Sequence, residues 1–220
     1  TGNTGGTTPP AGGSTPTGTN QSGNNTFGSG SGDVGSSDVS FAEVKRVREL
    51  YSEGFRLFSE DPVRAREFLS RAYVSGLLPA EDEKRVRVNI ARLNETLVFS
   101  RTVVPGDPFA QSYTVRPNDS LSAIVSQRSL LIDHRLLARV NDLKNPNNIR
   151  LGQQLKLITG PFHLVVHKNA YRADLFMGDA DDRVFVRSFV VGLGEGNSTP
   201  VGTFRVRPNS KLINPEWTNP

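Results

Sequence analysis

The spacing of apolar residues changes along this chain and divides it into segments with different expected structures. Residues 1–37 hold few apolar side chains; Gly, Thr, Ser, Asn and Pro dominate, and no charge precedes Asp33. Such a segment buries too little apolar surface to offset the conformational entropy lost on folding. We expect a disordered linker here, which either tethers the ordered part or only adds length.

A helical period begins at Ser40, from which apolar residues recur every three or four positions. Start signals predict three helices within residues 38–103: a Ser-x-x-Glu capping box at Ser40, an Asp61-Pro62 start, and Pro79 followed by acidic residues. The apolar stripes are Val44, Val47, Tyr51, Phe55 and Phe58; Ala65, Leu69, Ala72 and Tyr73; and Val86, Ile90, Leu93 and Leu97. We expect a small helical bundle held together by its own core. It weakly resembles a tetratricopeptide-type hairpin, which implies either a spacer or a surface that docks a protein partner.

Residues 104–111 are rich in Pro and Gly and predict a linker. The next segment, residues 112–159, begins with an alternating strand and turns at Pro117 into a helix with apolar positions at Leu121 and Ile124. A second helix ends near Asn141, and after an Asn-rich loop the chain returns as a strand. The expected order is strand, helix, helix, strand.

Short motifs run through this segment from end to end. They are Tyr113-x-Val115, Asp119-Ser120-Leu121, Asn141 and Ile149-x-x-Gly152-Gln153-x-Leu155. The segment resembles the lysin motif (LysM), which implies a βααβ module that binds N-acetylglucosamine-containing glycans in a shallow groove between its two outer loops. The residues implied to bind are Asn118, Asp119, Ser120, Leu121, Pro146, Asn147 and Ile149.

Each of these residues also has a structural interpretation. Asp119 and Ser120 are suited to capping the first helix, and Leu121 is suited to the core. One departure from the family is Asn118, which stands where glycine is usual. Because asparagine tolerates a positive φ better than most residues, we expect the turn to survive.

Residues 160–220 alternate with a period of two, which predicts an all-β platform. The expected strands are residues 162–167, 173–177, 184–191 and 203–206. Unpaired strand edges favour aggregation, so we expect this to be the least stable ordered segment. His163 and His167 lie on the opening strand and are expected to face solvent or a neighbour.

A distinctive run, Thr199-Pro200-Val201-Gly202-Thr203-Phe204, leads into the last expected strand and follows the apolar residues 189–192. Together with residues 210–218, it resembles the first half of the L,D-transpeptidase catalytic domain. That resemblance implies acyl transfer between peptidoglycan stem peptides by a histidine-activated cysteine thiolate. The chain has no cysteine and no match to the family's His-Gly-Thr or Ser-x-Gly-Cys motifs, so we predict no catalytic residue and no activity from these 220 residues alone.

Composition narrows the functional classes further. The net charge of +4 arises from Lys and Arg interspersed with Asp and Glu, a pattern that favours a solvated surface over nucleic-acid binding. The absence of cysteine excludes disulfides and thiolate metal sites, and we expect no cofactor and no metal. No apolar run approaches the roughly 18 residues that span a bilayer.

Taken together, these patterns predict a multidomain α+β protein of the bacterial cell envelope, facing the periplasm or the cell wall. The first hypothesis is a peptidoglycan-binding L,D-transpeptidase, with residues 160–220 as an incomplete catalytic domain and with glycan strands and stem peptides as partners. The alternative is a non-catalytic LysM protein that binds envelope glycan.

Overall fold

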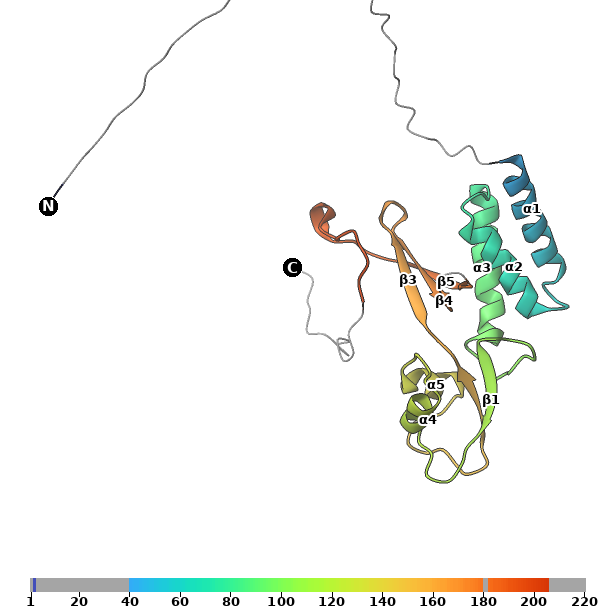
Figure 1. The fold of residues 1–220 in the computed structure, drawn as a ribbon, viewed down its shortest axis with the longest axis vertical. Coiled ribbons are helices and arrows are strands. Elements are labelled where there is room, and N and C mark those ends of the chain that lie inside the picture. The colour runs from blue at the N-terminus through green and yellow to red at the C-terminus, as the bar shows by residue number, and fades with distance from the viewer. Residues whose placement is uncertain (1, 3–39, 180–181, 206–220) are drawn as a thin grey trace, which may run out of the picture. The chain divides into compact units, whose positions relative to one another are not determined.

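A computed structural model describes residues 2, 40–179 and 182–205 (Figure 1). Contacts divide the chain into two units, Thr1–Asp38 and Val39–Pro220. Nearly all of the predicted linker therefore lies outside the described residues. So do residues 210–218, on which part of the transpeptidase resemblance rests.

All three predicted helices are present as α1 (Phe41–Arg56), α2 (Pro62–Val74) and α3 (Ala80–Leu97). The capping box forms at α1, where the Glu43 amide donates to the Ser40 hydroxyl and the Glu43 carboxylate accepts from the Ser40 amide. Gly54 allows α1 to approach α2 closely, because a Cβ at this position would lie 2.6 Å from the Leu69 side chain.

Three antiparallel strands follow the LysM-like segment, in the order β3–β4–β5: β3 (Phe162–His167), β4 (Arg172–Met177) and β5 (Val184–Val190). The predicted fourth strand is wrong for residues 203–205, which are not in a strand, and Val206 lies outside the described residues. Alternation over so few residues does not make a strand unless a neighbouring strand accepts its hydrogen bonds.

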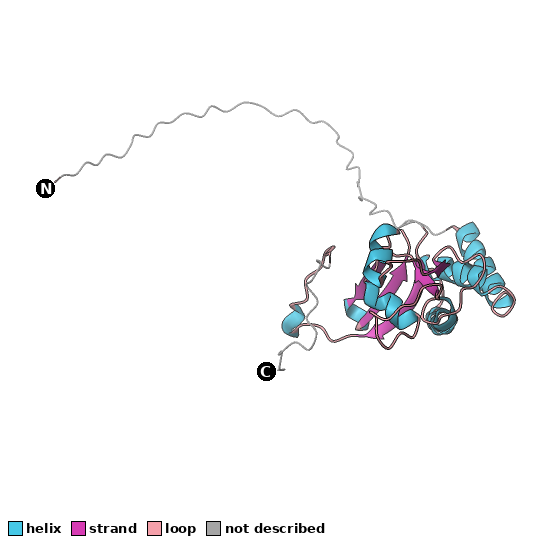
Figure 2. Ribbon diagram, turned by 90° about the horizontal axis from the view of Figure 1, so that it is seen from below, coloured by secondary structure: helices cyan, strands magenta, loops and turns pink. Residues whose placement is uncertain are grey.

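The sequence predicted a separate helical bundle, but in the structure α2 and α3 pack against β5 (Figure 1). Figure 2 shows helices lying beside the strands. One core cluster joins the two layers; its buried members are Leu69, Tyr73, Val86, Ile90, Phe176 and Phe185. Asn94 strengthens the contact by donating to the carbonyls of Phe185 and Val186 at 3.0 Å each. The apolar stripes of the helices therefore face a sheet as well as one another.

The predicted strand–helix–helix–strand segment is β1 (Ala110–Thr114), α4 (Leu121–Gln127), α5 (His134–Val140) and β2 (Gln154–Ile158). The two strands pair antiparallel, and β1 begins inside the predicted 104–111 linker. A core of its own lies between the sheet and the two helices; its buried members include Tyr113, Leu121, Ile124, Leu137, Leu155 and Leu157.

Three buried charged side chains connect this segment, and the residues just before it, to the helices. Arg66 of α2 pairs with Asp107 at 2.7 Å, and each side chain is only 1% exposed. The ammonium group of Lys156, on β2, donates to the carbonyls of Leu97 and Thr102 at 2.7 Å and of Thr96 at 3.2 Å. Only residues 159–161 separate β2 from β3.

Candidate functional site

The first predicted binding loop is the turn between β1 and α4. Asn118 adopts the positive φ expected of it, 64°. The Asp119 carboxylate accepts from the Arg116 amide at 2.7 Å and from the Tyr113 hydroxyl at 2.8 Å. These two hydrogen bonds lower the pKa of Asp119 below its usual value. Asp119 therefore fixes the shape of the turn, and the exposed Asn118 is the polar side chain at its tip.

The next two predicted residues begin α4. The Ser120 hydroxyl accepts from the Ala123 amide at 3.1 Å, which makes it the N-cap. Leu121 is 2% exposed and belongs to the core. These two residues therefore support the loop. A ligand on the outer surface would contact that loop more than it would contact the side chains of Ser120 and Leu121.

The second predicted loop connects α5 to β2. Of the residues predicted to bind, Asn147 is exposed, and Pro146 and Ile149 are half-buried. Ile149 packs against the core cluster on its inner side. The Asn147 amide donates to the Asn145 carboxamide at 3.0 Å, which shapes the loop from within.

Backbone hydrogen bonds bring the two loops together. The Val115 amide donates to the Gln153 carbonyl, and the Gly152 amide donates to the Val115 carbonyl, both at 2.9 Å. Both loops therefore leave the same end of the β1–β2 sheet, just beyond the pair Thr114 and Gln154. This end presents amide side chains beside apolar ones, a mixture suited to the hydroxyl and acetamido groups and the ring faces of a sugar.

The comparison with protein families settles the nature of this segment. Residues 113–157 form a LysM domain, because they match the family model of that description. The match covers both predicted loops and all four elements from Tyr113 onward. The rest of the chain lies outside it, and nothing found there shows an L,D-transpeptidase domain.

Other comparisons add little. No curated protein matches the chain. A solved structure described as a MoCVNH3 variant in complex with (N-GlcNAc)4 aligns at 16% identity and a TM-score of 0.22, over 37% of this chain and 54% of its own. The match thus spans about half the length of that protein, and a similarity this weak carries no argument about fold or ligand.

A cavity of about 340 Å³, which the sequence did not predict, lies beside the LysM domain. It is lined by the loop after α3, through Arg101 and Thr102, and by the sheet, through Ser112, Gln154 and Lys156. Hydrophobic periodicity gives no signal for such a cavity, because most of its lining residues are polar and they come from segments as far as about 50 positions apart in the sequence.

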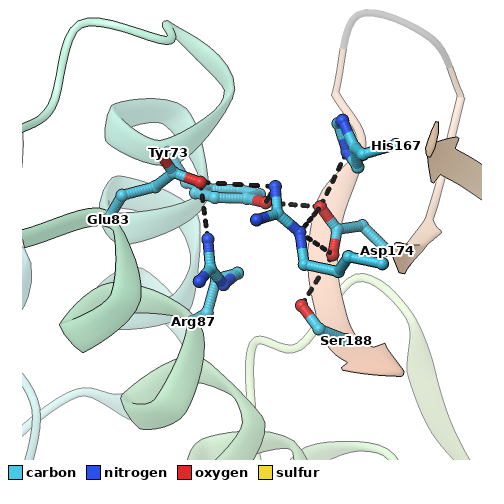
Figure 3. Close-up of polar contacts among 7 residues, drawn as sticks. Tyr73, Glu83, Arg87, His167, Asp174 and Ser188 are labelled. Carbon is cyan, nitrogen blue, oxygen red and sulfur yellow. Dashed lines mark hydrogen bonds and ion pairs between the residues drawn. The ribbon is translucent and has the colours of Figure 1, made fainter. Parts of the chain in front are cut away.

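A second polar cluster surrounds the buried Asp174, between the helices and the β3–β5 sheet (Figure 3). Its carboxylate accepts from the Tyr73 hydroxyl, from the Ser188 hydroxyl at 2.6 Å and from Arg172, and lies 2.9 Å from His167 Nε2. Burial raises the pKa of Asp174, but the hydrogen bonds from Ser188 and Tyr73 and the charges of Arg172 and His167 outweigh it, so that its pKa is lowered.

This cluster lacks the geometry of a catalytic triad. In such a triad, histidine bridges the nucleophile and the carboxylate. Here both Ser188 and His167 contact Asp174 itself, so the carboxylate orders its neighbours without activating one of them. His167 contacts Asp174 and is also partly exposed, so it meets both a neighbour and solvent, the two environments that the sequence predicted as alternatives.

In the part of the chain that the structure describes, no three His, Cys, Asp or Glu side chains are grouped to hold a metal ion. Within residues 40–179 and 182–205, no helix has both the length and the hydrophobicity needed to cross a bilayer.

Proposed function

We propose that this protein binds N-acetylglucosamine-containing glycan of the cell envelope through its LysM domain. The observation that carries the proposal is the LysM match over residues 113–157, within which the two predicted loops lie side by side at one end of the sheet. LysM domains are typical of extracellular and cell-envelope proteins, so we place the protein on the periplasmic or cell-wall side of the envelope.

The proposed contacts divide into two kinds. Asn118 and Asn147 are exposed and offer amide donors and acceptors to the sugar's hydroxyl and acetamido groups. Pro146 and Ile149 are half-buried and offer an apolar surface to the ring face. Asp119, Ser120 and Leu121 act indirectly, by holding the β1–α4 turn and the start of α4.

Sedimentation with purified peptidoglycan sacculi and with chitin beads tests this proposal. We expect the protein to sediment with both, and Asn147→Ala to weaken binding about fivefold to tenfold, the effect of losing one or two hydrogen bonds. Asn147 is the best position to change, because replacing Asp119 would also disturb the turn.

Asn89→Ala is the matched control, since it removes the same side chain from a half-buried position on α3, outside the LysM domain. It should bind like the unmodified protein. If the unmodified protein stays in the supernatant with both polymers, glycan binding is wrong.

A second candidate concerns residues 160–220, which we propose belong to an L,D-transpeptidase domain. The supporting observation is an antiparallel three-stranded sheet followed by Val191-Gly192 and then by Thr199-Pro200-x-Gly202-x-Phe204. Under this proposal the LysM domain delivers an acyltransferase to its peptidoglycan substrate. The stem peptides would then be partners as well as the glycan strands, and the helices would remain free to dock a protein.

Two experiments test the second candidate. Sequencing the gene onward from the codon for Pro220 should give a continuing frame with His-Gly-Thr and Ser-x-Gly-Cys motifs; a stop codon would contradict it. The 220-residue chain itself should release no D-alanine from tetrapeptide-stem muropeptides, because it lacks a cysteine nucleophile.

A further inference from the structure

We propose that the cavity beside the LysM domain binds a carboxylate carried by the glycan, and that the protein therefore prefers acidic N-acetylglucosamine polymers to neutral ones. The inference rests on the proposed glycan binding and adds the charge of the preferred substrate. It assigns a binding role to Arg101, which lies outside the 113–157 match.

A polar strip leads from the proposed sugar-binding loops to the cavity. Gln154 donates from its side-chain amide to the Thr114 hydroxyl at 2.8 Å and accepts from the Ser112 hydroxyl at 3.1 Å. All three side chains are exposed, and Thr114 and Gln154 form the last strand pair before the two loops. Tyr113 and Leu155, which alternate with them, point into the LysM core, so the strip occupies the opposite face of the sheet.

The charges around the cavity are positive. Arg101 is exposed, and among the described residues no carboxylate forms an ion pair with it. Lys156 is 1% exposed, and its ammonium group is surrounded by main-chain carbonyls. The acidic group that acts on Lys156 is Asp107, which is already paired with Arg66. Arg101 and Lys156 thus leave two positive charges without a paired carboxylate.

These two charges have different roles. The three carbonyls accept all three hydrogen bonds that the Lys156 ammonium group can donate. Lys156 therefore attracts a bound carboxylate through its positive charge and makes no hydrogen bond to it. Arg101 retains a planar guanidinium that can donate to both oxygens of a carboxylate. The cavity is open to solvent and, at about 340 Å³, lies at the lower end of the range of small-molecule sites, which leaves room for a carboxylate with its neighbouring atoms.

Each muramic acid residue of peptidoglycan supplies a carboxylate from one of two sources. Where the residue carries no peptide, its lactyl carboxylate is free; where it carries a stem, the lactyl carboxyl is amide-bonded and the stem supplies the carboxylates. Chitin supplies none. Three probes separate these sources in titrations with the full chain. They are chitotetraose, a peptide-free tetrasaccharide of alternating N-acetylglucosamine and N-acetylmuramic acid, and the same tetrasaccharide bearing tetrapeptide stems.

We expect at least one acidic tetrasaccharide to bind about threefold or more tightly than chitotetraose, the range of a solvent-accessible ion pair. This preference should shrink as salt is added. Preference for the peptide-free probe would identify the lactyl carboxylate, and preference only for the stem-bearing probe would identify the peptide; both support the proposal. Arg101→Gln should abolish the preference and leave the affinity for chitotetraose unchanged.

Arg48→Gln, which removes the same charge from the exposed face of α1, is the control and should retain the preference. Circular dichroism confirms that each variant folds. Equal binding of acidic and neutral probes by the unmodified protein, or an equal preference in Arg101→Gln, would overturn the inference while leaving glycan binding intact. Failure to bind any of the three probes would overturn the proposed function itself, and the inference with it.

Discussion

The Tyr73 hydroxyl donates a hydrogen bond to the carboxylate of Asp174, which joins α2 to β4 across 101 positions of sequence. Both side chains are buried, and Tyr73 also stacks on Phe176 and meets Phe185 edge to face. One aromatic residue therefore contributes to the apolar core and to the polar cluster of Figure 3. This combination makes the contact between helices and sheet specific as well as stable.

Tyr73→Phe tests the polar half of this contact. The ring stays, while a buried carboxylate loses a donor, so the free energy of unfolding should fall by about 1–3 kcal/mol in urea denaturation. Tyr51→Phe is the control, because Tyr51 donates to Asp82 at 2.8 Å in a half-buried setting. Tyr51→Phe should lower the free energy of unfolding by less than half as much as Tyr73→Phe. Equal losses in the two variants would show that burial does not strengthen the hydrogen bond between Tyr73 and Asp174.

The lowered pKa of Asp174 predicts sensitivity to acid. Since the folded-state pKa lies below the ordinary value of 3.8, the unfolded chain takes up the proton first as the pH falls. Its contribution to stability is complete above about pH 4 and is lost as the pH drops through the folded-state pKa. Thermal unfolding from pH 7 to pH 2.5 should therefore show the unmodified protein converging on Asp174→Asn below pH 4. A difference in melting temperature between the two proteins that stays constant with pH would contradict the lowered pKa of Asp174.

The buried Arg66–Asp107 ion pair predicts that removing one of the two charges strongly destabilises the protein. Asp107→Asn leaves the Arg66 guanidinium buried without its counter-charge, and should lower the free energy of unfolding by about 3–5 kcal/mol. The double variant Arg66→Met/Asp107→Asn should lose less than that single variant, because no unpaired charge remains. The exposed pair of Arg71 and Glu67 supplies the control: Arg71→Met should change stability by less than about 1 kcal/mol.

Lys156 predicts a change at alkaline pH. Burial lowers its pKa from 10.5 to about 8, an effect that the charge of Asp107 partly opposes. Between these two values the unfolded chain binds the proton more often than the folded protein does, so the free energy of unfolding should rise with pH. Denaturation at pH 7.5 and pH 9.5 should show this gain in the unmodified protein and in Lys45→Met, an exposed control, and a smaller gain in Lys156→Met. Parallel behaviour of all three proteins would contradict the assignment.

The positive φ of Asn118 predicts opposite effects of two small substitutions. Asn118→Ala should destabilise the protein by about 1 kcal/mol, because a Cβ is strained in this region and alanine has no side-chain polar group to compensate. Asn118→Gly should keep or raise the melting temperature. Glycan titrations on both variants separate the turn from its side chain: if Asn118 contacts the sugar, both should bind more weakly although only one is destabilised.

Local signals in the sequence were sufficient for the helices and for the LysM domain. The capping box at Ser40, the Asp61-Pro62 start and the Tyr113-x-Val115 strand each depend on residues within a few positions of one another. Such short-range chemistry can be recognised without knowing the rest of the fold. The positive φ at Asn118 was predictable for the same reason.

The contacts between layers could not be predicted in this way. Ser70 accepts from the Phe185 amide at 3.0 Å, and Asn94 donates to the carbonyls of Phe185 and Val186, although both helix residues look like ordinary surface positions. Their partners lie more than 90 positions away, beyond any periodic pattern. The cavity beside Arg101 was missed for the same reason, since it exists only once the loop after α3 lies against β2.

The hydrogen bonds from Lys156 to three main-chain carbonyls also form a route by which a pulling force would be transmitted from β2 to the helices. A load on a sugar held by the LysM loops would enter β2, pass through the Lys156 ammonium to the end of α3, and pass along residues 159–161 to β3. The connection of residues 159–161 is too short to extend and so reduce this load. Under the proposed glycan binding, tension in a bound polymer would therefore reach the contact between helices and sheet, to which Tyr73 and Asp174 contribute a buried hydrogen bond.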